Sequence, residues 1–257
     1  MLSMKNGDNF VKSSKELQHY LHSDENKLIC RPYMLECQRF SEIALLYSNK
    51  CHLIFNSLNS NTVCYAYSVG GEALHRGYYC PSPILDIVVG NCSRGKLLKR
   101  VTEKSKPTYR YGYDSNNEII TVDQIYLDSN EIIVRQGQIE TGILFTKDFG
   151  INTLSECIYN GKQLTSYAFC LYSAYEKRVV EYRKEEYQYS AAGLDKANSF
   201  IFLNDKKAPI LQHEQYHFQH DSEGYLSRYT VIHYEGELIK PSVWDGHVFD
   251  VKIRRKV

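Results

Sequence analysis

The stretch QHEQYHF, residues 212–218, contains the pattern His-Glu-x-x-His, formed by His213, Glu214 and His217. On a helix, two histidines with this spacing stand one turn apart on one face and share a zinc ion, and the glutamate acts as general base. On a strand the two histidines also share a face, but at ~3.3 Å per residue they lie ~13 Å apart. One zinc ion, with bonds of ~2 Å to nitrogen, cannot bridge that distance. The chemistry therefore depends on the local backbone.

A strand is the better prediction for residues 210–220. The segment lies between two turn patterns, at 204–207 and 221–224, and it has the length of a strand. Tyr216 and Phe218 alternate on one face together with Ile210, whereas a helix would give no continuous apolar stripe. We therefore predict no metal site, no catalytic residue and no cofactor.

A zinc-dependent hydrolase is the alternative if this segment is helical. Pro209 would then open the helix, His213 and His217 would bind zinc, and Glu214 would activate water. His220 or Glu223 would be the nearest candidate for a third ligand.

Residues 90–96 imitate the phosphate-binding pattern Gly-x4-Gly-Lys-Ser/Thr after an apolar run at 84–89. Leu97 occupies the position whose hydroxyl should bind magnesium, and no alternation of strands and helices follows. A turn relaxed by glycine is the better interpretation.

Composition bears on the partner and the compartment. The chain has 257 residues with 43% hydrophobic content, and 31 lysines and arginines nearly balance 30 aspartates and glutamates. This balance gives no reason to expect nucleic acid as a partner. The first residues lack the apolar core of a signal peptide, and no stretch approaches the ~20 apolar residues that cross a bilayer. We expect a cytoplasmic protein with no membrane partner.

The N-terminal part, residues 1–106, is predicted to be mixed. Ser13 and Glu16 have the spacing of a capping box, which predicts a short helix over residues 13–22 that packs on a sheet. Strand-like patterns follow at residues 28–35, 40–47, 51–58 and 62–69. Pro32 would confine the first of these strands to an edge. The polar stretch 104–107 suggests a junction, although the two parts could form one continuous domain.

The C-terminal part, residues 107–257, repeats a hairpin pattern of tyrosine-rich runs separated by turns with Asp, Asn or Gly. These turn residues tolerate the positive φ that tight hairpins require. The repeats span residues 111–122, 126–134, 158–167, 200–211, 216–231 and 233–239. Successive hairpins predict a mainly β fold, an antiparallel meander with one short N-terminal helix packed on the sheet.

Two of these units carry a resemblance. Tyr-x-Tyr-Asp-x-x-Asn-Glu-Ile at 111–119 and Asp-x-x-Gly-x-Leu at 221–226 resemble the YD repeat of the Rhs-like family. The resemblance covers roughly the C-terminal part and implies continuous antiparallel sheet, but no catalytic residue. The full-length proteins of that family are large toxin-carrying shells, and this chain is far too short to be one.

A tyrosine-rich sheet without a catalytic set favours a non-enzymatic protein-binding module. Tyrosine supplies large contact area at low entropic cost, and the chain has 22 of them. By analogy with proteins that accompany YD-repeat toxins, the most concrete form is a bacterial cytosolic immunity protein that neutralises a cognate toxin domain. A structural β scaffold is a second alternative. The candidate contact residues, each of which could instead pack in the core, are Tyr109, Tyr111, Tyr113, Tyr187, Tyr189 and Tyr229.

Overall fold

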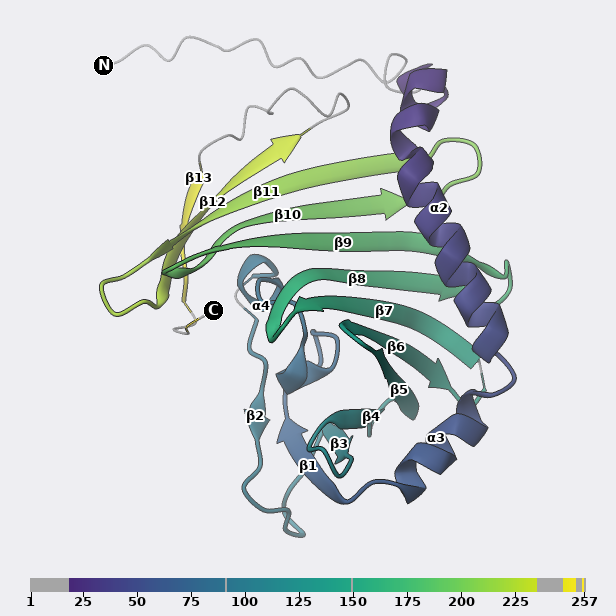
Figure 1. Ribbon diagram of the computed structural model, residues 1–257, viewed down its shortest axis with the longest axis vertical. Coiled ribbons are helices and arrows are strands. Elements are labelled where there is room, and N and C mark those ends of the chain that lie inside the picture. The colour runs from purple at the N-terminus through teal and green to yellow at the C-terminus, as the bar shows by residue number, and fades with distance from the viewer. Residues whose placement is uncertain (1–18, 91, 149, 235–246, 253–255, 257) are drawn as a thin grey trace.

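A computed structural model describes residues 19–90, 92–148, 150–234, 247–252 and 256. Most of the predicted helix over residues 13–22 and most of the predicted hairpin over residues 233–239 lie outside the described residues. Element labels follow Figure 1.

One antiparallel sheet of 13 strands forms the body of the described chain (Figure 1). From β13 back to β3 each strand pairs with its neighbour in the sequence, and β1 lies between β3 and β2 at the far end. The predicted mainly β fold with an antiparallel meander is confirmed. The strands are β1 Cys64–Val69, β2 Lys96–Leu97, β3 Tyr109–Tyr113, β4 Ile119–Gln124, β5 Ser129–Gln136, β6 Ile139–Thr146, β7 Gly150–Asn160, β8 Gln163–Ser173, β9 Arg178–Ser190, β10 Gly193–Leu203, β11 Ile210–His220, β12 Leu226–Tyr234 and β13 His247–Asp250.

The turns form for the reasons that the sequence suggested. In the β3–β4 turn the Asp114 carboxylate accepts hydrogen bonds from the backbone N–H groups of Asn116 and Glu118, both at 2.9 Å. Asp221 does the same for Glu223 and Tyr225 in the β11–β12 turn. Such Asx turns reverse the chain within a few residues.

Two helices replace three of the predicted strands. The predictions for residues 28–35, 40–47 and 51–58 are wrong, because α2 (Asp24–Tyr47) and α3 (Cys51–Ser60) occupy this region. The fourth predicted strand, over residues 62–69, is present as β1. Ser23 caps α2 by accepting a hydrogen bond from the N–H of Asn26 at 3.1 Å, and Pro32 lies inside the helix.

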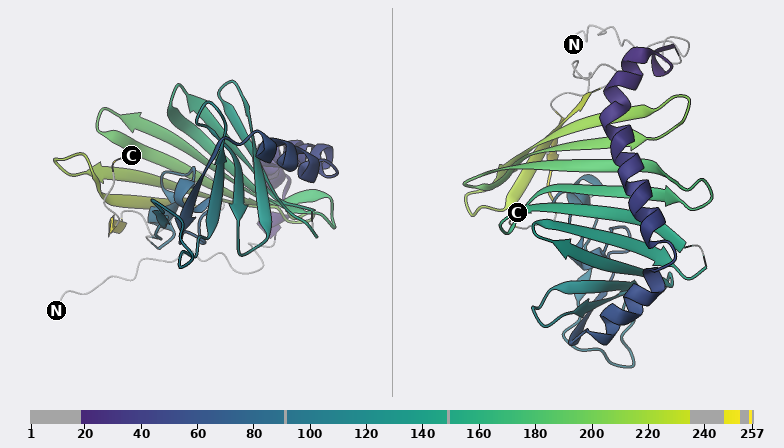
Figure 2. Two further views of the ribbon diagram at one scale, coloured as in Figure 1. Left: turned by 90° about the horizontal axis from the view of Figure 1, so that it is seen from below. Right: turned by 45° about the vertical axis from the view of Figure 1, so that its right-hand side comes forward.

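We call the side of the sheet that α2 and α3 cover the helix face (Figure 2). Phe40 is fully buried there against Tyr182, and Phe55 of α3 packs edge-on against Phe145. Arg39 also joins α2 to the sheet through two hydrogen bonds with Glu156, at 2.8 and 2.9 Å. Apolar burial, rather than helix propensity, therefore holds the two helices in place.

Residues 71–95 cover the opposite side, which we call the loop face. This segment contains η1 (Gly77–Tyr79) and α4 (Leu85–Val88). Ile84 and Ile87 are fully buried against β7–β12, and the rings of Tyr78 and Tyr79 pack over β3–β5. The two predicted parts of the chain thus share one sheet and its cores. Within the described residues, no helix is both long and apolar enough to cross a membrane.

Candidate functional site

The His-Glu-x-x-His stretch lies on β11, and the predicted strand over residues 210–220 is confirmed. His213 stacks between the rings of Phe200 and Tyr234, at centroid distances of 4.4 and 4.5 Å. His217 contacts Gln215 through its Nε2 atom at 2.9 Å. Burial lowers the pKa of both histidines, which favours neutral imidazoles.

The strand also separates the glutamate from both histidines. Side chains alternate between the faces of a strand, so Glu214 points to the loop face while His213 and His217 point to the helix face. Glu214 accepts a hydrogen bond from the Tyr216 hydroxyl and lies 2.9 Å from Nδ1 of His233. This geometry removes the physical basis of the zinc-hydrolase alternative. No group of three or more His, Cys, Asp or Glu residues in the described ranges could hold a metal ion.

The stretch that imitates a phosphate loop has the wrong elements around it. The short helix α4 precedes Gly90 and the strand β2 begins at Lys96, whereas a phosphate loop follows a strand and opens a helix. Arg94 is turned inward, where it binds Asp86 and the carbonyl oxygens of Cys80 and Ser82. Arg94 therefore stabilises its own loop through contacts within the chain.

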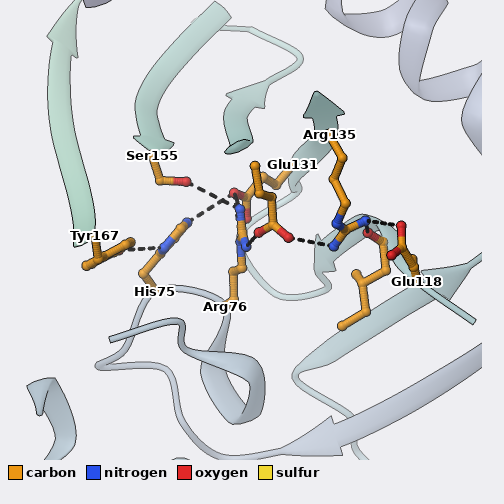
Figure 3. Close-up of polar contacts among 9 residues, drawn as sticks. His75, Arg76, Glu118, Glu131, Arg135, Ser155 and Tyr167 are labelled. Carbon is orange, nitrogen blue, oxygen red and sulfur yellow. Dashed lines mark hydrogen bonds and ion pairs between the residues drawn. The ribbon is translucent and has the colours of Figure 1, made fainter. Parts of the chain in front are cut away.

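A buried ion network joins residues 75 and 76 to strands β5 and β6 (Figure 3). Arg76, in the left-handed conformation at φ 60°, donates to Glu131 at 2.8 and 2.9 Å and to Glu140 at 2.5 Å. His75 lies between Glu131, at 3.2 Å, and the Tyr167 hydroxyl, at 2.8 Å. The carboxylates come from strands β5 and β6, Arg76 comes from the segment 71–95, and Arg135 of β5 also donates to Glu140, at 2.6 Å.

The centre of the network is closed to solvent. The side chains of Arg76 and Glu131 are only 5% and 1% exposed. Burial alone would raise the pKa of Glu131, but Arg76 and His75 outweigh it and hold this pKa at about 2. We conclude that the network fixes residues 71–95 to the sheet. In the sequence, the sign of this network is the presence of acidic residues inside apolar strands. Acidic residues are almost never buried unless they are paired.

The six tyrosines that were candidates for partner contact serve mainly to pack the sheet. Tyr109, Tyr111, Tyr187 and Tyr229 are buried, with exposed fractions of 7% or less. Tyr113 and Tyr189 are half-buried, and their hydroxyls donate to the Tyr79 hydroxyl and the Leu164 carbonyl. The side chains best placed to meet a partner are therefore different ones.

The β4–β5 turn exposes three large apolar residues in succession. Ile125, Tyr126 and Leu127 have exposed fractions of 44%, 63% and 68%. The sequence pattern predicts a hairpin unit over residues 126–134, but the turn spans residues 125–128 and β5 begins at Ser129. The signal that sequence reasoning missed was the run Ile-Tyr-Leu itself, because turns usually carry Gly, Asn, Asp, Pro or Ser.

A hollow of about 340 Å³ adjoins this turn on the helix face. Its floor is a row of directly paired residues across β1, β3, β4 and β5, namely Tyr67, Arg110, Asp123 and Asn130. Gln124, Ile125 and Asp128 complete the lining. We call residues 125–127 together with this hollow the turn surface.

A larger hollow, of about 810 Å³, lies beside α2. Its floor includes Ile158, Ala168 and Tyr182. The charges that line it are paired with one another, Arg39 with Glu36 and Glu156, and Lys184 with Glu186. The turn surface differs from it, because its polar groups are incompletely satisfied and its apolar residues project outward.

No protein-family model matches the chain, and no curated protein has a significantly similar sequence.

Proposed function

We propose that this chain is a non-enzymatic protein-binding module, most concretely a bacterial cytoplasmic immunity protein that neutralises a cognate toxin domain. The observation that carries the proposal is the exposed run Ile125, Tyr126 and Leu127 beside a polar hollow. Clustered apolar and aromatic side chains on a surface are typical of protein interfaces. The specific toxin partner rests on the resemblance to YD-repeat proteins.

Hydrogen bonds hold the β4–β5 turn in place, which favours binding without rearrangement of its backbone. The N–H of Ile125 donates to the carbonyl of Thr108 at 2.9 Å, and the N–H of Leu127 donates to the carbonyl of Gln124 at 3.1 Å. Ser129, at the start of β5, donates to the Gln124 side chain at 2.9 Å. A turn held by such bonds loses little conformational freedom when a partner covers it.

Co-expression with the product of the gene immediately upstream tests the proposal. We expect the two chains to co-purify, and we expect this protein to relieve any growth arrest that the upstream product causes. Tyr126→Ala should weaken binding about tenfold or more, as truncation of an aromatic hot spot does, when the affinity is measured by calorimetry.

Leu35→Ala is the matched control, because Leu35 is a large apolar residue on α2 that is 58% exposed and remote in sequence from the turn. Its affinity should equal that of the unmodified chain. Loss of binding in Leu35→Ala but not in Tyr126→Ala would move the interface to α2. Absence of any complex would refute the immunity function.

A further inference from the structure

We infer that the hollow of the turn surface binds the guanidinium group of an arginine side chain. This inference rests on the proposed function, because it names the group that the partner would present to this surface. The volume of the hollow, about 340 Å³, lies at the lower end of the ~300–1,000 Å³ of ligand pockets and suits one long side chain.

Asp123 provides the first reason. Its residue is 7% exposed, Arg110 donates to its Oδ2 atom, and its Oδ1 atom accepts no hydrogen bond from any described residue. Arg110 is therefore the one described side chain that hydrogen-bonds to this carboxylate. Burial raises the pKa of Asp123 even though Arg110 opposes the rise, so one cation does not fully compensate this carboxylate.

The charge of the lining provides the second reason. Asp123 and Asp128 carry two negative charges against the single positive charge of Arg110. The Arg110 guanidinium is held in place, because it also lies 4.9 Å from the centre of the Tyr65 ring. An additional cation in the hollow would therefore restore the balance of charge.

The arrangement of acceptors favours guanidinium over ammonium. Asp128 and Asn130 present carboxylate and amide oxygens, and neither side chain has a hydrogen-bond partner within the part of the chain that the structure describes. The planar guanidinium has five N–H donors in a fixed fork, which match acceptors on several sides, and it stacks on aromatic rings such as that of Tyr67. Oδ1 of Asp123 is closed to water, so it acts on the cation through its charge, whereas Asp128 and Asn130 make direct contact.

Titration of the full chain with N-acetyl-arginine amide, followed by amide NMR spectra, tests this inference. We expect weak, saturable binding that shifts the amide signals of residues 123–130. The uncharged citrulline analogue should cause no shifts, and N-acetyl-lysine amide should bind more weakly. Asp128→Asn should lower the affinity for the arginine probe about tenfold. Asp195→Asn, which neutralises an exposed carboxylate on β10, is the matched control and should leave the affinity unchanged.

Equal shifts from the citrulline analogue, or no shifts up to the solubility limit of the arginine probe, would overturn the inference. Tighter binding of the lysine probe would overturn the assignment to arginine. If Tyr126→Ala impairs the complex with the toxin domain but the arginine probe does not bind, the inference fails while the proposed function stands. If the probe binds but no complex with the upstream product forms, the proposed function fails while the arginine site stands.

Discussion

At the scale of single residues, Gly142 on β6 leaves the space that the buried ion network needs. A Cβ atom at this position would lie 2.1 Å from Oε1 of Glu131 and 2.3 Å from Nη2 of Arg76. These atoms cannot move without breaking their mutual hydrogen bonds. We therefore expect Gly142→Ala to lower the free energy of unfolding by about 2–4 kcal/mol, as measured by urea denaturation.

Gly137→Asn is the control for that prediction. Gly137 lies in the β5–β6 turn at φ 61°, and a Cβ atom at this position would have no other atom within 4 Å. Asparagine tolerates this left-handed conformation, so the change should stay within about 0.5 kcal/mol. Equal losses for the two variants would mean that the space around the network is not what Gly142 provides.

The Glu131 carboxylate should make the stability of the fold depend on pH. Its pKa is about 2 in the folded chain against 4.5 for the ordinary group, so the folded state resists protonation. The stabilising contribution is complete above pH 4.5 and is lost as the pH falls through about 2. In Glu131→Gln the free energy of unfolding should fall less steeply over this range than in the unmodified chain. Parallel pH profiles from urea denaturation would contradict the assignment.

At the scale of elements, α2 depends on the residues that it turns toward the sheet. Phe40 is fully buried and lies 4.3 Å from the Arg39 guanidinium and 5.9 Å from the Tyr182 ring. Phe40→Ala should lower the free energy of unfolding by about 3–5 kcal/mol, because it leaves a cavity between α2 and the sheet. Leu35→Ala, on the outer side of the same helix, should cost less than about 0.5 kcal/mol. Urea denaturation of both variants measures the difference.

The helices also show where sequence reasoning failed. The buried positions of α2 include Cys30, Cys37, Phe40 and Ala44, which have helical spacing. Exposed leucines at 28, 35, 45 and 46 hid this stripe, and Pro32 argued against a helix. A proline inside a helix costs about 3 kcal/mol, and only the packing of the helix on the sheet, which the local sequence does not reveal, offsets that cost.

The hairpins show the opposite case, because their information is local. Asp114, Asn117, Gly161 and Gly224 supply the turn geometry within a few residues of the strands that they join. The meander and the strand at 210–220 were therefore predictable. The ion network was not, because its contacts to Arg76 and His75 join residues 55 to 92 positions apart, and each residue looks ordinary in its own segment. The hollow was not predictable either, since its floor requires the register of four strands.

At the scale of the whole molecule, the sheet is stabilised unevenly. Strands β7, β8 and β9 lie under α2 on the helix face and carry buried residues of both cores, such as Cys170 on the helix face and Tyr167 on the loop face. Strand β12 pairs outward only with the four residues of β13, whereas the main contacts of α2 with the sheet are to β7, β8 and β9. The centre of the described sheet is thus packed on both faces, whereas its β12–β13 end is packed less extensively.

Native-state hydrogen exchange should follow this gradient. In a meander each strand contacts mainly its sequence neighbours, so the β12–β13 end can open without disrupting the centre, as the end of a repeat array does. We expect amides of β12 to exchange by local opening and amides of β8 and β9 to exchange only on global unfolding, with the slowest rates in the sheet. Arg76→Met leaves Glu131 and Glu140 buried without the cation that they share. This variant should therefore accelerate exchange in residues 71–95, β5 and β6 more than in β9. Uniform protection across the sheet would instead show that all its strands unfold as one cooperative unit.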